Sequence, residues 1–224
     1  MSDRPRLVVL ASGRGSNLQA LIDAIAAGTL AARIVAVYSD RRDAGALQRA
    51  REAGIPAHAL APRQYPSRAE YDAALFARID AETPDLIVCA GYMRLIDPRE
   101  VEFRRGRIIN IHPSLLPAFK GLRTHAQALA AGACEHGASV HYVTADLDGG
   151  PVIAQARVPV LPGDDAETLA GRVLEHEHPL LVETVRWLAA GRIALPADAA
   201  PEAPIHVDGV PHAPLQLASN QRFA

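Results

Sequence analysis

Short apolar runs alternate with amphipathic stretches along the first half of the chain. The runs are nearly continuous in apolar residues, which is typical of strands that helices cover on both faces. The predicted strands are 7–10, 33–38, 86–90 and 107–111, with a short extended stretch at 55–60. Apolar residues recur at helical spacing between them, and the predicted helices are 18–26, 43–53 and 68–82. This order predicts an α/β fold with a mostly parallel central sheet.

The second half of the chain has a different order of predicted elements. We expect a helix at 125–131, then strands at 139–144 and 152–160, which are close enough in sequence to pair antiparallel. A long helix is expected from about residue 164 to 190, with an interruption and kink before Pro179. Residues from 195 onward are rich in proline and alanine and are expected to form a surface extension, with a hairpin as one option. The predicted organisation is therefore a single domain over 1–194 and an extension over 195–224.

Composition excludes several classes of protein. The 224 residues are 49% hydrophobic, and the formal net charge of -2 gives no reason to expect a nucleic-acid or membrane partner. No stretch approaches the roughly 20 apolar residues of a membrane span. Two cysteines are too few for a disulfide scaffold, so we expect a reducing, cytoplasmic location.

A glycine-rich turn joins the first predicted strand to the first predicted helix. Gly13 and Gly15 let the backbone approach a ligand closely, and the first helical N–H groups attract an anion. We therefore expect residues 13–17 to bind a monophosphate. A dinucleotide site is an alternative that Asp40 supports, although Leu18 stands where a third glycine belongs. A tight turn without a ligand is the third possibility.

Two polar residues end the strand at 107–111. Asn110 and His112 are two positions apart, so both point to one face at the end of a strand where parallel sheets bind ligands. An amide and an imidazole can hold an oxyanion and move a proton. Asp148, in a turn that also fits an ordinary hairpin, would favour a protonated imidazole if it lay beside His112. A structural, hydrogen-bonded histidine is the alternative for His112.

No histidine or cysteine spacing predicts a metal site. His176 and His178 are too close for one helix face, and Cys134, His136 and His141 lack a zinc spacing. Cys89 lies in a buried strand pattern and is expected to be an inert core residue.

Four segments lie in a recognisable order between residues 6 and 191. They are GSNLQA at 15–20, GYMR at 91–94, NIHPSLLP at 110–117, and GASVH continuing to LDGGPVI at 137–153. As a set, they resemble the phosphoribosylglycinamide formyltransferase family. The resemblance implies a Rossmann-like three-layer fold with a mostly parallel sheet and a late antiparallel strand pair. It also implies transfer of the formyl group of 10-formyltetrahydrofolate, as co-substrate, to the amine of 5-phosphoribosylglycinamide in purine biosynthesis.

The resemblance assigns roles residue by residue. The implied catalytic residues are Asn110, His112 and Asp148, and the implied ribonucleotide contacts are Gly15, Ser16, Asn17 and Glu177. The implied folate contacts are Arg68, Met93, Arg94, Leu95, Ile96, Asn110, Thr144, Ala145, Asp146, Leu147 and Asp148. Relatives vary at the loop 119–125, where some have histidine in place of Arg123, so phosphate contacts from this loop stay open. Partners are expected to be small-molecule substrates, with a homodimer as an open option.

Three other functions are weighed against this one. A formyltetrahydrofolate hydrolase, or the catalytic half of a tRNA formyltransferase, would share the Asn-His-Asp arrangement. The phosphate loop favours the ribonucleotide enzyme, and a tRNA enzyme is expected to carry a further basic domain. A non-catalytic nucleotide-binding module is the more distant alternative, and it would tolerate His112→Ala.

Overall fold

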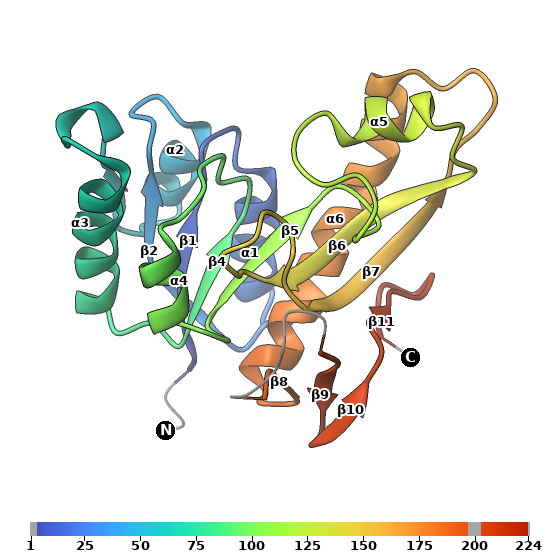
Figure 1. Ribbon diagram of the computed structural model, residues 1–224. Helices are drawn as coiled ribbons and strands as arrows, with labels where there is room; N and C mark the ends of the chain where they lie inside the picture. Colours follow the sequence, from blue (N-terminus) through green and yellow to red (C-terminus); the bar gives the residue numbers. More distant parts are fainter. Residues whose placement is uncertain (1–3, 197–202, 224) are drawn as a thin grey trace. The chain divides into compact units, whose positions relative to one another are not determined.

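The computed structural model describes residues 4–196 and 203–223, and the chain divides into two compact units. The first unit is Met1–Asn110, coloured blue to green in Figure 1, and the second is Ile111–Ala224, coloured green to red. The boundary predicted at residues 194 and 195 is a different division and stays a prediction.

Five parallel strands form the sheet of the first unit, in the order β3-β2-β1-β4-β5. They are β1 (Arg6–Leu10), β2 (Arg33–Ser39), β3 (Ala57–Ala59), β4 (Leu86–Cys89) and β5 (Ile108–His112), the last of which continues two residues into the second unit. The chain builds outward from β1 to β3 and then returns to place β4 on the other side of β1. The carboxyl ends of β1 and β4 are therefore neighbours at a switch point, where open α/β sheets bind ligands.

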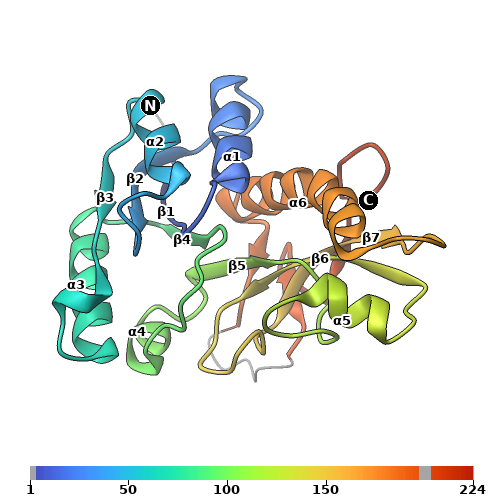
Figure 2. The same cartoon turned by 90° about the horizontal axis from the view of Figure 1, so that it is seen from above.

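Helices cover both faces of this sheet. Figure 2 shows α1 (Ser16–Ala26) and α2 (Gly45–Glu52) on one face, and α3 (Arg68–Ala81) and α4 (Pro98–Phe103) on the other. A 3-10 turn, η1 (Pro62–Gln64), precedes α3. The sequence pattern did not predict α4, because six residues are too few to show a helical repeat. The start of α4 is nevertheless well defined, since the Asp97 side chain caps it and Pro98 occupies its first position.

An antiparallel pair dominates the second unit. It consists of β6 (Glu135–Tyr142) and β7 (Val152–Pro159), and α6 (Ala166–Ala189) packs against both strands. A shorter helix, α5 (Thr124–Ala130), contacts α6. The predicted antiparallel pairing is confirmed. Within the described ranges, no helix is long and apolar enough to span a membrane.

One predicted strand boundary in this unit is wrong, and the long helix runs without the interruption predicted at Pro179. β6 begins at Glu135, not at residue 139, although it contains Gly137. This glycine is required by packing, because a Cβ there would lie within 1.9 Å of the Ala156 carbonyl oxygen on β7. α6 continues through Pro179, and its buried face of Leu180, Leu181 and Val185 supports the helix beyond the proline.

Part of the tail after residue 194 packs against the rest of the second unit, and part of it is exposed. A three-stranded antiparallel sheet joins β8 (Ile193–Ala194), β9 (Ile205–Val207) and β10 (Val210–His212), and β9 with β10 forms the hairpin that was one option for this segment. β11 (Leu215–Gln216) adds a parallel edge strand to β7, which the sequence did not predict. Glu183 of α6, 1% exposed, accepts hydrogen bonds from the Arg222 side chain and the Phe223 backbone N–H. Residues 197–202 and 224 of the predicted extension lie outside the described residues.

Candidate active site

The predicted phosphate loop lies directly after β1. Gly15 adopts a left-handed backbone with φ 76° as the residue before α1, and Asn17 is buried in the first turn. Helix α2 braces the loop, because the Ala46 N–H donates to the Gly13 carbonyl over 3.1 Å. A Cβ on Gly15 would lie 2.6 Å from the Ala46 Cα, so only glycine fits here. The arrangement presents the amino end of α1 to an anion.

The segment at residues 91–97 follows β4, beside that loop in sheet order. Ser12 joins the two strand ends, because its N–H donates to the Gly91 carbonyl and its Oγ accepts from the Met93 N–H, both over 2.9 Å. Met93 and Leu95 are 68% and 53% exposed, so this segment presents apolar side chains to solvent. Apolar side chains at a switch point suit a flat aromatic ligand.

The two predicted folate-contact arginines lie close to one buried carboxylate. Burial raises the pKa of Asp72, while the N–H of Asp97 and the charges of Arg94 and Arg68 oppose that rise. The Arg94 guanidinium also lies 5.0 Å from the centre of the Tyr71 ring, at cation–π distance. The first unit therefore groups Arg68 and Arg94 near Asp72.

Asn110 and His112 both belong to β5. Asn110 is half-buried and pairs in register with Cys89, at the carboxyl end of β4. Cys89 itself is buried, and burial raises the pKa of its thiol to about 12, as expected of an inert core cysteine.

The turn after β6 brings Asp148 next to His112. Asp148 Oδ2 lies 3.6 Å from His112 Nδ1 and accepts a hydrogen bond from the Gly121 N–H over 2.9 Å. Both side chains are about nine-tenths buried, so their charges are poorly screened by water. The geometry confirms that this turn lies beside the histidine.

The other imidazole nitrogen of His112 has a fixed role. Nε2 lies 3.1 Å from the Phe119 carbonyl oxygen, which can only accept, so Nε2 carries a proton. Nδ1 then faces the Asp148 carboxylate either as a lone pair or, in the imidazolium, as a second N–H. The Asp148 carboxylate therefore lies on the side of the ring opposite the Phe119 carbonyl.

Two glycines make the Asp148 turn possible. A Cβ on Gly150 would lie 1.9 Å from the Tyr142 carbonyl oxygen, and one on Gly149 would lie 2.7 Å from the Asp146 Cβ. Of the other predicted folate contacts in this turn, Asp146 and Leu147 are exposed and Thr144 is half-buried.

A second histidine faces the same carboxylate. His141 Nε2 lies 3.7 Å from Asp148 Oδ1, and burial lowers the pKa of His141 to about 4 despite the opposing effect of Asp148. His141 is therefore neutral at pH 7. The sequence pattern indicated His141 only as a possible metal ligand that lacks a zinc spacing. Strand periodicity gave no signal for it, because β6 is buried at every position from His136 to Tyr142.

A buried polar network holds the segment that follows His112. Ser139 Oγ donates to the Ser114 carbonyl over 2.7 Å and accepts from the Leu116 N–H over 3.0 Å. Gln155 of β7 donates to both Ser139 Oγ and the Leu116 carbonyl. Fully paired buried polar groups of this kind rigidify a segment.

Glu177 lies on the buried face of α6 and is 9% exposed. No cluster of three His, Cys, Asp or Glu side chains among the described residues could hold a metal ion.

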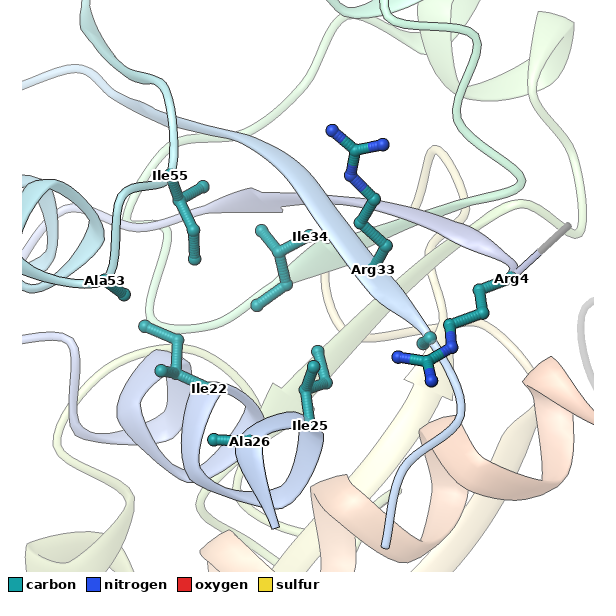
Figure 3. A pocket seen from close by; sticks show the side chains of 9 residues that line it. Arg4, Ile22, Ile25, Ala26, Arg33, Ile34, Ala53 and Ile55 are labelled. Carbon is teal, nitrogen blue, oxygen red and sulfur yellow. The ribbon is translucent and has the colours of Figure 1, made fainter. Parts of the chain in front are cut away.

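A cavity of about 440 Å³ lies elsewhere in the first unit, between α1 and β2 (Figure 3). Ile22, Ile25, Ile34 and Ile55 line it, and none of the predicted site residues does. Arg4 and Arg33 also line it, and Figure 3 shows the Arg33 guanidinium pointing away from these isoleucines.

Comparison with known proteins identifies the family. The sequence model described as formyl transferase matches residues 5–185, which is most of the chain. The chain belongs to the formyl transferase family. It is 48% identical over 194 residues to the phosphoribosylglycinamide formyltransferase of Escherichia coli (strain K12), covering 87% of this chain and 92% of that protein.

Solved structures of the family share the fold. The phosphoribosylglycinamide formyltransferase of Coxiella burnetii, solved in complex with CHES, has a TM-score of 0.88 at 48% identity and covers 94% of this chain and 97% of that one. A formyltetrahydrofolate deformylase from Pseudomonas syringae pv. tomato has a TM-score of 0.82 at 25% identity, covering 92% of this chain and 66% of that one. The predicted formyltransferase fold, with a mostly parallel sheet, is confirmed.

Proposed function

We propose that the chain transfers the formyl group of 10-formyltetrahydrofolate to the amine of 5-phosphoribosylglycinamide, giving formylglycinamide ribonucleotide and tetrahydrofolate in purine biosynthesis. The observation that carries this proposal is the pairing of His112 with Asp148, found in a chain that matches such enzymes along nearly its whole length. A histidine beside a buried carboxylate suits a reaction that passes through an oxyanion.

The chemistry needs two proton transfers and no covalent enzyme intermediate. The substrate amine attacks the formyl carbon, and the carbonyl electron pair moves to oxygen to form a tetrahedral oxyanion. Collapse of this intermediate breaks the bond between the formyl carbon and the folate nitrogen. That nitrogen gains a proton, and the amine loses one.

Asn110 and His112 stabilise the oxyanion in this proposal. The Asn110 amide donates one hydrogen bond, and His112 donates another from the nitrogen that contacts the Phe119 carbonyl in the structure. Exchange of a neutral carbonyl for an anion strengthens the bond in the transition state, which is the condition for catalysis. Asp148 supports the positive charge of His112 and helps pass a proton from the amine to the folate nitrogen.

The remaining predicted residues bind the two substrates. Gly15, Ser16 and Asn17 bind the ribonucleotide phosphate at the amino end of α1, and the Glu177 carboxylate accepts hydrogen bonds from the same substrate. The folate contacts are Arg68, Met93, Arg94, Leu95, Ile96, Asn110, Thr144, Ala145, Asp146, Leu147 and Asp148.

A hydrolase that releases formate from the same folate is the second candidate. The likeness to the Pseudomonas syringae deformylase supports it, although at lower identity than the ribonucleotide enzymes. The two reactions differ in the acceptor, which is water in the hydrolase. The glycine loop at residues 13–17 favours the ribonucleotide as acceptor.

An absorbance assay for tetrahydrofolate release separates these functions. We expect release only when glycinamide ribonucleotide is present, and we expect His112→Ala to abolish it without loss of folding. Release that does not require the ribonucleotide would establish the hydrolase. Full activity of His112→Ala would contradict the proposed mechanism. A rise in melting temperature on addition of NAD would support a nucleotide-binding module.

Two broader proposals accompany the function. A cytoplasmic location is supported by the two free cysteines, Cys89 and Cys134. A homodimer stays a prediction, which the molar mass from light scattering tests.

A further inference from the structure

Residues 91–97, which we call the folate segment, have alternating side-chain exposure. Met93 and Leu95 are exposed, whereas Tyr92, Arg94 and Ile96 are partly buried. This is the alternation of an extended chain, and it directs one set of side chains to solvent and the other to the protein. The direction of Met93 and Leu95 therefore depends on what holds the other side of the segment.

The segment is fixed at its start by Ser12. Ser12 is 3% exposed, and its Oγ accepts the Met93 N–H over 2.9 Å. Its own N–H donates to the Gly91 carbonyl, so one residue at the end of β1 holds both sides of the segment's first turn.

The segment is fixed at its end by Asp72 of α3. Asp72 is fully buried, and its Oδ2 accepts the Asp97 N–H over 2.7 Å. The Asp97 side chain in turn caps α4 by accepting from the Arg99 N–H over 2.9 Å. The Asp72 bond therefore sets where the folate segment stops and α4 begins.

Helix α3 also holds the middle of the segment through the residue before Asp72. The Tyr71 and Tyr92 hydroxyl groups are 3.1 Å apart, and the Arg94 guanidinium lies over the Tyr71 ring. Tyr71 and Asp72 thus contact the protein-facing side of the folate segment, opposite Met93 and Leu95.

We propose that Asp72 is a positioning residue for folate binding, which holds the folate segment so that Met93 and Leu95 present a fixed apolar surface to the pterin ring. Asp72 contacts no substrate and acts through the Asp97 backbone. The inference rests on the proposed function, because it requires a folate as the ligand of this segment. This role explains why a carboxyl group is buried beneath the segment, since fixed geometry at a binding site depends on the residues behind it.

The test compares Asp72→Ala with Asp72→Asn. Asp72→Ala removes the acceptor for the Asp97 N–H, and we expect the KM for the folate to rise at least about tenfold. The KM for the ribonucleotide and the kcat at saturating folate should stay within about twofold. Asp72→Asn keeps an oxygen acceptor in the same place, so we expect it to recover most of the folate affinity.

Asp80→Ala is the matched control on the same helix. Asp80 pairs with Arg104 at the end of α4, so its loss weakens packing between α3 and α4 without touching the folate segment. We expect a lower melting temperature and an unchanged folate KM. If Asp80→Ala raises the folate KM as much as Asp72→Ala does, the effect is general destabilisation and the proposal is wrong.

Calorimetry of tetrahydrofolate binding separates this inference from the proposed function. A wild-type chain that binds no folate would overturn the function itself. A wild-type chain that binds folate, with Asp72→Ala binding equally tightly, would overturn the positioning role alone. Should Asp72→Ala fail to fold, Ser12→Ala tests the other end of the segment, and an unchanged folate affinity there would contradict fixation of the segment by its ends.

Discussion

Gly15→Ala is expected to damage phosphate binding and stability through one atom. Gly15 has a φ of 76°, a region in which a non-glycine residue costs roughly 1–2 kcal/mol. The added Cβ would also lie 2.6 Å from the Ala46 Cα, a backbone atom that moves only if α2 moves. Overpacking of this kind costs about 1–3 kcal/mol. Together these terms predict a loss of roughly 2–5 kcal/mol in the free energy of unfolding.

Gly28→Ala separates the two terms. Gly28 follows the same helix and has a φ of 72°, but a Cβ there would meet nothing within 4 Å. The backbone term alone predicts a loss of about 1–2 kcal/mol. The difference between the two variants in urea unfolding therefore measures the clash with α2.

The kinetic part of the prediction concerns the substrates. Because the Ala46 N–H bonds to the Gly13 carbonyl, movement of α2 carries the loop with it. We expect Gly15→Ala to raise the KM for the ribonucleotide at least about tenfold and the KM for the folate less than about twofold. Equal stability losses in the two variants would refute the steric argument, and equal rises in both KM values would refute the loop as a phosphate site.

Asn110→Ala is expected to lower kcat about 10²–10³-fold with little change in ribonucleotide KM, because an oxyanion donor acts in the transition state; a change confined to KM in steady-state assays would contradict this. Asp148→Asn removes the charge beside the imidazole and should lower kcat at least about tenfold. The exposed-carboxylate control Glu135→Gln should stay within about twofold, and equal effects would exclude a role for the Asp148 charge. Burial lowers the pKa of His136 to about 4. Between about pH 6.5 and pH 4 the unfolded chain therefore binds a proton at His136 that the folded chain does not. The free energy of unfolding should consequently fall by up to about 3 kcal/mol as the pH drops through that window. If the urea midpoint of His136→Gln falls with pH as steeply as that of the wild type, other groups cause the loss of stability at acid pH. Glu183→Gln weakens the charge-assisted hydrogen bonds to two arginines, so we expect the free energy of unfolding to fall by about 1–3 kcal/mol. Trypsin should then cleave the tail faster. An unchanged cleavage rate would show that Glu183 does not hold the tail.

The local pattern of the chain predicted most elements of the first unit. A fully buried strand such as β4 is apolar at every position, and α1 has apolar residues at helical spacing. Both patterns can be recognised in the sequence. Short elements leave no such record. α4 and β11 are held by a cap and by an edge pairing, and they were missed for that reason.

The sequence by itself determined that Gly15 opens a helix after a strand, and that Asn110 and His112 share a strand end, because these relations are set by neighbours in the chain. The resemblance grouped Asp148 with His112, but only the tertiary structure gave their distance, placed His141 against the same carboxylate, and placed Asp72 beneath the folate segment. These contacts join residues far apart in sequence, and each depends on how a turn or helix packs on its unit. The tail shows the same limit, since its attachment to Glu183 depends on a carboxylate that the chain reaches only after folding back to α6. The spacing of apolar residues in the sequence indicates which positions are buried, whereas tertiary packing decides which partner a buried polar group has.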